Sequence, residues 1–161
     1  MDSISTSTLF AVLAVMLLTS AFFSASETAM MAINRYRLRH AAESGVRGAM
    51  RAQALLDQTD KLLGVILLGN NLVNSASGTL SAVLAIRLFG DGEMVLFAAT
   101  LLLTFLILVF SEVTPKVIGA SFPERVAYPA TLLLTPLLTL AYPVVWFVNL
   151  FVQGILKLLH I

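Results

Sequence analysis

The sequence predicts an all-α membrane protein with three transmembrane helices, a proline-kinked juxtamembrane helix that runs as a belt, and a short cytoplasmic helical hairpin. Composition is the first reason: the 161 residues are 58% hydrophobic and 12% charged, with mean hydropathy +0.92. Soluble domains average about 45–50% apolar and 25% charged residues. The second reason is that the charges are segregated and leave four long uncharged runs. With a net charge of +1 and no cysteine, we expect neither a nucleic-acid-binding domain nor a thiolate metal site. We do not expect an enzyme either, because the sequence shows no base–nucleophile or paired-acid constellation.

The first three uncharged runs cover residues 3–26, 62–86 and 94–111. A membrane-spanning helix needs roughly 20 mostly apolar residues. We therefore expect one crossing from each run, with helices over about 5–33, 62–87 and 94–120.

Residues 34–61 separate the first two runs and carry most of the positive charge. The six basic residues exceed the three acidic ones by three: Arg35, Arg37, Arg39, Arg47, Arg51 and Lys61 against Glu43, Asp57 and Asp60. Basic loops stay on the cytoplasmic side, which predicts an external N-terminus and an outer loop at 87–93. The segment itself predicts two short helices, 37–44 and 49–56, in an interfacial hairpin that touches anionic lipid.

The fourth run, 126–156, is too long for one simple crossing and contains Pro129, Pro136 and Pro143. Because proline kinks or ends helices, we expect a broken segment. Two tyrosines and Trp146 are typical of the membrane interface. The segment could cross the membrane or lie flat, and we favour a juxtamembrane belt over about 126–158.

Three polar clusters interrupt the apolar runs, at residues 22–27, 68–78 and 110–116. Polar side chains in membrane helices usually face the protein interior or a water-filled cavity. Ser24 and Glu27 share one helix face, and Asn70 and Asn74 are one turn apart. The clusters are therefore candidates for an internal polar site.

The third cluster predicts a helix irregularity. Pro115 has no N–H to donate to the carbonyl of Ser111, so we expect the helix to open at Ser111–Glu112. Broken helices at this depth commonly present backbone oxygens to a cation. Together, Glu112, Asn70, Asn74 and Ser24 would form an all-oxygen set that suits Mg²⁺, Ca²⁺, Mn²⁺ or Na⁺.

Structural interpretations compete with this one. The asparagines could hydrogen-bond across helices, and small residues could serve close helix packing; the candidates for packing are Ser77, Gly78 and Ser81. Glu27 could pair with Arg35 or Lys116 at the cytoplasmic edge.

Three motifs, FSASETA at 23–29, LLGNNLVN at 67–74 and SEVTPK at 111–116, resemble the transmembrane domain of the CorB/CorC and cyclin M (CNNM) family in order and spacing. The resemblance covers nearly the whole chain. It implies Mg²⁺ transport, mainly sodium-dependent export, by a homodimer whose subunits each have three spanning helices and a belt. Family members usually continue into cytosolic CBS domains that bind ATP, which are absent from these 161 residues.

The resemblance also implies which residues hold the ion: Ser24, Asn70, Asn74 and Glu112. Further ligands could be Ser26, Asn71, or the carbonyls of Gly69 and Ser111. We therefore predict a Mg²⁺ transporter domain of a prokaryotic inner or plasma membrane, with an external N-terminus and a cytoplasmic C-terminus. The alternative is a non-transporting membrane anchor or Mg²⁺ sensor for cytosolic regulatory domains.

Overall fold

The computed structural model describes residues 4–161, so Asp2 and Ser3, at the predicted external N-terminus, lie outside the described residues. All regular elements from residue 4 onward are helices, which confirms the predicted all-α class. They are α1 (Thr6–Ala32), α2 (Arg35–Glu43), α3 (Arg47–Leu56), α4 (Thr59–Phe89), α5 (Glu93–Leu106), the π-helix η1 (Ile107–Val113), α6 (Thr114–Ser121) and α7 (Pro123–Leu158).

Four helical stretches are long and apolar enough to cross a membrane: Thr6–Ala32, Thr59–Phe89, Glu93–Ser121 and Pro123–Leu158. The chain is therefore an integral membrane protein. The first three stretches begin and end within three residues of the expected helices, and the third comprises α5, η1 and α6.

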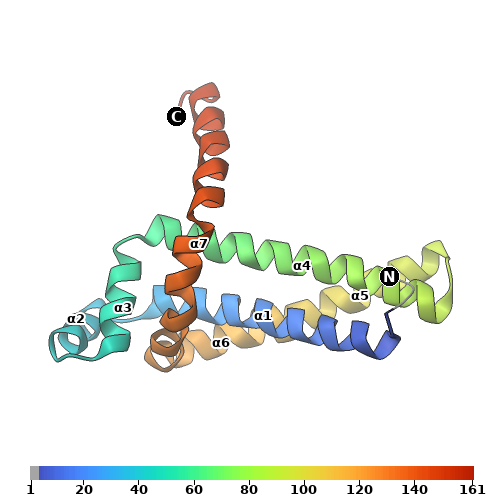
Figure 1. Ribbon diagram of the computed structural model, residues 1–161, viewed down its shortest axis with the longest axis horizontal. Coiled ribbons are helices and arrows are strands. Elements are labelled where there is room, and N and C mark those ends of the chain that lie inside the picture. The colour runs from blue at the N-terminus through green and yellow to red at the C-terminus, as the bar shows by residue number, and fades with distance from the viewer. Residues whose placement is uncertain (1–3) are drawn as a thin grey trace.

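These three stretches lie side by side as an elongated bundle (Figure 1). α1 contacts both α4 and the η1–α6 segment, and small residues allow the close approach. A Cβ atom at Gly119 of α6 would lie 2.5 Å from the Ala25 carbonyl oxygen of α1, and one at Gly69 of α4 would lie 2.7 Å from the Phe23 ring. The bundle therefore depends on glycine at both contacts.

Helices α2 and α3 gather at one end of the bundle, opposite the α4–α5 turn (Figure 1). The Asn34 side chain caps α2 by accepting from the N–H groups of Tyr36 and Arg37. Gly45, with φ of +90°, reverses the chain between the two helices. Arg51 then ties α3 to α7, because its Nε donates to Thr131 Oγ1 at 3.0 Å.

Helix α7 runs across the bundle at the end occupied by α2 and α3, and its C-terminal half projects beyond the other helices (Figure 1). We expected a broken segment here, and that was wrong: α7 is one helix of 36 residues with three internal prolines. All three prolines lie on its exposed face. Their spacing of seven residues keeps the missing N–H groups on one side, so the helix curves at these points without breaking.

Candidate functional site

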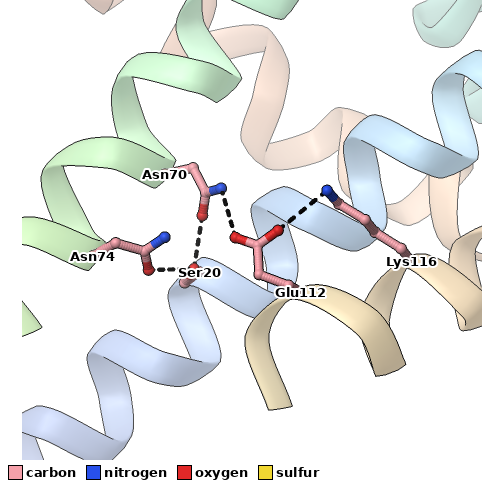
Figure 2. Close-up of polar contacts among 5 residues, drawn as sticks. All are labelled: Ser20, Asn70, Asn74, Glu112 and Lys116. Atoms are coloured by element: carbon pink, nitrogen blue, oxygen red, sulfur yellow. Dashed lines mark hydrogen bonds and ion pairs between the residues drawn. The ribbon is translucent and has the colours of Figure 1, made fainter. Parts of the chain in front are cut away.

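Polar side chains from α1 and α4 meet in the interior of the bundle. Ser20 is fully buried near the middle of α1. Its Oγ lies 2.7 Å from Asn70 Oδ1 and 2.7 Å from Asn74 Oδ1, both on α4 (Figure 2). Because the asparagines are one helical turn apart, their amides reach the same serine.

This contact brings together more acceptors than protons. A hydroxyl carries a single proton, and amide oxygens only accept. Ser20 can therefore donate to one of the two amide oxygens at a time. The amide oxygen that receives no proton needs a cation beside it, or the Asn74 amide must rotate so that its NH2 group faces Ser20. The Asn70 amide is not free to rotate in this way, because it makes a further contact.

That further contact joins the cluster to the third membrane stretch. Asn70 Nδ2 donates to Glu112 Oε1 at 3.3 Å, and the other carboxylate oxygen, Oε2, lies 3.1 Å from Lys116 Nζ. Figure 2 shows the chain of contacts from Asn74 through Ser20, Asn70 and Glu112 to Lys116. The Glu112 side chain is 24% exposed and that of Lys116 is 47% exposed, so the site reaches the surface on the Lys116 side.

The backbone that carries Glu112 is a π-helix. We expected the helix to open at Ser111–Glu112, and the irregularity is at that position but has another form. The Thr114 N–H bonds to the Val109 carbonyl, five residues back, so the chain widens by one residue per turn instead of breaking. Such π-turns occur frequently at functional sites. Ser111 anchors the turn on α1, because its Oγ donates to the Leu17 carbonyl at 2.8 Å.

The serines of the first motif are buried beside this cluster in α1. Ser24 follows Ser20 by one turn, and both Ser24 and Ser26 are fully buried. Neither hydroxyl has a hydrogen-bond partner. Buried hydroxyls without partners are costly, so these two are unexplained by packing alone.

Asn71 and Gly69 have other surroundings. Asn71 is exposed, and it lines a groove of about 480 Å³ between α4 and α7 together with Ser75 and Asn149. Gly69 accommodates the Phe23 ring. The structure thus gathers Asn70, Asn74 and Glu112 and leaves Asn71 outside the cluster.

Of the competing structural interpretations, an ion pair of Glu27 and close packing by small residues, the structure agrees with some and disagrees with others. Lys116 pairs with Glu112, and among residues 4–161 no ion pair involves Glu27. Ser77 is buried and donates to the Val73 carbonyl, as expected of a packing residue. A Cβ at Gly78, in contrast, would meet nothing within 4 Å in this chain.

The described residues contain no group of three or more His, Cys, Asp or Glu side chains placed to hold a metal ion. A cation at this cluster would therefore be held by one carboxylate and neutral oxygens.

Sequence reasoning missed two members of the cluster. Ser20 stands one turn before Ser24 on the same stripe of α1, and that spacing was the available signal. Lys116 follows Glu112 by four residues, the spacing of a helical ion pair.

Comparison with known proteins bears on the whole chain. The family model described as "Cyclin M transmembrane N-terminal domain" matches residues 11–161. The chain belongs to this family. The resemblance carried by the three motifs is therefore confirmed.

Relatives of this membrane domain are found in bacteria and plants. The chain is 44% identical over 158 residues to a UPF0053 protein of Haemophilus influenzae, which covers 98% of the chain and 37% of the relative. It is 47% identical over 142 residues to the UPF0053 inner membrane protein YfjD of Escherichia coli, covering 88% of the chain and 33% of the relative. A chloroplastic DUF21 domain-containing protein of Arabidopsis thaliana is 34% identical over 148 residues, covering 92% of the chain and 22% of the relative. The chain thus spans about a third of the length of the two bacterial relatives.

Proposed function

We propose that this CNNM-family domain carries Mg²⁺ across the membrane of a prokaryotic cell, through a site formed by Ser20, Asn70, Asn74 and Glu112. The observation that carries the proposal is the contact of three oxygens with a single proton, next to a carboxylate, in the interior of an apolar bundle. A cation would satisfy the surplus oxygens. The donor set is entirely hard oxygen, which suits Mg²⁺.

Ser24 is a further ligand in this proposal, because its hydroxyl is buried one turn from Ser20 and has no partner. The Ser26 hydroxyl is equally unsatisfied. Carbonyls of the π-turn, including that of Ser111, and the Gly69 carbonyl remain candidates on the grounds of the family resemblance. Asn71 is the weakest candidate, since its side chain is exposed and lines the groove against α7.

In the membrane we propose three crossings, with α7 as the belt on the cytoplasmic side. Two observations favour this arrangement over a fourth crossing. α7 runs across the bundle rather than along it (Figure 1), and it contacts the arginine-rich α3, which positive charge assigns to the cytoplasm. The N-terminus would then be external and the C-terminus cytoplasmic.

We further propose a homodimer, sodium-coupled export as the direction, and control by ATP-binding CBS domains in the whole protein. The exposed apolar residues of the projecting half of α7 support a second copy as a partner, since lipid or protein must cover them: Phe147, Val148, Leu150, Phe151, Ile155 and Leu158. Sodium coupling and CBS control follow from the family resemblance.

The test is Mg²⁺ flux through the full-length protein in liposomes loaded with a Mg²⁺ indicator, with and without a sodium gradient. The matched control is Glu112→Gln, which removes the carboxylate charge and keeps the shape. We expect flux in the parent and none in the variant. A parent that binds Mg²⁺ in calorimetric titration but moves none would instead be the membrane anchor or Mg²⁺ sensor.

A further inference from the structure

Lys116 makes a contact that the proposed function leaves without a role. Its ammonium lies 3.1 Å from Glu112 Oε2, while the other oxygen of the same carboxylate accepts from Asn70 of α4. The Glu112 side chain is about three-quarters buried. Solvent screens such a pair far less than an exposed helical ion pair.

The lysine therefore neutralises, through Oε2, the same carboxylate whose Oε1 faces the asparagines and would bind a transported cation. A divalent ion on this carboxylate would lie within a few ångströms of the ammonium, where like charges repel strongly at low dielectric. Each cation therefore weakens the attraction of Glu112 for the other, so binding of a divalent ion favours the departure of the ammonium.

The Lys116 ammonium can also move away from Glu112. Its side chain is 47% exposed, and its flexible four-carbon stem can carry the charge toward solvent or lipid headgroups. Among residues 4–161, the Lys116 side chain has no other ion pair or hydrogen bond that its departure would break. The asparagines and Ser20 remain in place on α4 and α1.

We propose that the Lys116 ammonium is an exchangeable counter-cation of the ion site, bound to Glu112 when the site is empty and displaced when a divalent ion binds. The inference rests on the proposed function and adds a selectivity device to the same site. On release of the ion, the returning ammonium neutralises Glu112 and opposes immediate rebinding.

Discrimination between ions follows from the tether. An ammonium on the same helix is present at a high effective concentration. A monovalent ion carries the same single charge, so its attraction to Glu112 gives it no advantage over the tethered ammonium. A divalent ion brings twice the charge to the carboxylate and can displace it. Lys116 thus excludes Na⁺ and K⁺ from Glu112 while admitting Mg²⁺.

The experiment is calorimetric titration of MgCl₂ into the purified chain in detergent, at low salt and with added KCl, for the parent and Lys116→Met. Lys116→Arg keeps the charge, and Lys157→Met is the matched control, because Lys157 lies at the far end of α7. Lys116→Gln serves as the neutral variant if the methionine variant does not give a monodisperse peak in size exclusion.

We expect the neutral variants to bind Mg²⁺ at least about tenfold more tightly at low salt, the equivalent of one partly buried ion pair no longer broken. Added KCl should weaken their Mg²⁺ binding more than that of the parent. Lys116→Arg and Lys157→Met should bind as the parent does.

Equal or weaker Mg²⁺ binding by the neutral variants overturns the inference, and weaker binding would mean that Lys116 merely holds Glu112 in position. The proposed function fails separately. If the parent binds no Mg²⁺, or binds it undiminished after Glu112→Gln, then both proposals fall. If binding depends on Glu112 and not on Lys116, only this inference falls.

Discussion

Gly119 offers the sharpest test of how the third membrane stretch packs on α1. A Cβ atom at this position would lie 2.5 Å from the Ala25 carbonyl oxygen and 3.2 Å from the Ala29 nitrogen. Both are backbone atoms of α1, so neither can rotate away. Gly119→Ala must therefore push α6 away from α1 or strain both helices.

Two opposing effects set the magnitude. Replacing glycine by alanine inside a helix gains about 1 kcal/mol of intrinsic helix propensity. Overpacking a well-packed contact costs roughly 1–3 kcal/mol. Gly78→Ala is the matched control because nothing lies within 4 Å of its added Cβ. This variant therefore has the gain in helix propensity without the cost of a clash. The clash should separate the two variants by about 1–3 kcal/mol, with Gly119→Ala the less stable.

The assay is thermal unfolding in one detergent at one scan rate. A separation of this size corresponds to melting temperatures roughly 2–12 °C apart for a chain of this length. Gly69→Ala should fall between the two, because its Cβ would meet the Phe23 ring at 2.7 Å, and a side chain can partly give way. If Gly119→Ala melts at or above Gly78→Ala, the close approach of α6 to α1 is refuted.

Three further predictions concern the site, the topology and the assembly. Ser20→Ala should weaken Mg²⁺ binding by about tenfold in calorimetric titration, the equivalent of one neutral polar contact. Thr19→Ala should not, because Thr19 is only partly buried and its hydroxyl donates to the Val15 carbonyl of its own helix; equal affinities in the two variants would remove Ser20 from the site. The chain has no cysteine, so single cysteines can report topology: one at Asp91, in the exposed α4–α5 turn, should react with an impermeant thiol reagent outside intact cells, and one at Ser44 should not; the opposite pattern would invert the proposed orientation. Mass analysis in nanodiscs should give a protein component of twice the 17.3 kDa of one chain, and a monodisperse monomer would contradict the homodimer.

The sequence was sufficient to predict the positions of the helices and part of the polar cluster. Segregated charges predicted the three apolar stretches, and the one-turn spacing of Asn70 and Asn74 predicted that both belong to one internal polar site. The sequence was not sufficient to identify Ser20 as the side chain that both asparagines contact. A serine in the middle of an apolar helix often bonds its own backbone, so the one-turn spacing of Ser20 from Ser24 does not by itself identify Ser20 as a contact of α4.

The effect of proline on the helix was predicted wrongly at two places, for the same physical reason. At Pro115 we expected an open helix, and in α7 we expected a break. A missing N–H fixes where the normal bonding must change but not how. A shift to five-residue bonding before Pro115 and an outward-facing proline stripe on α7 each accommodate the loss with the helix intact. Which accommodation occurs depends on neighbours that are distant in sequence.

The π-turn also has a consequence for how the third stretch is phased. One additional residue in a helix rotates everything beyond it by about 100° and advances it by about 1.5 Å. Glu112 lies within this turn, while Lys116 and Gly119 lie beyond it. Deleting one residue from 107–110 would restore α-helical phase, but with α5 in place it would turn both the carboxylate out of line with Asn70 and the glycine out of line with Ala25. The polar cluster and the helix contact therefore share a single register, and an insertion or deletion between Glu112 and Gly119 cannot preserve both.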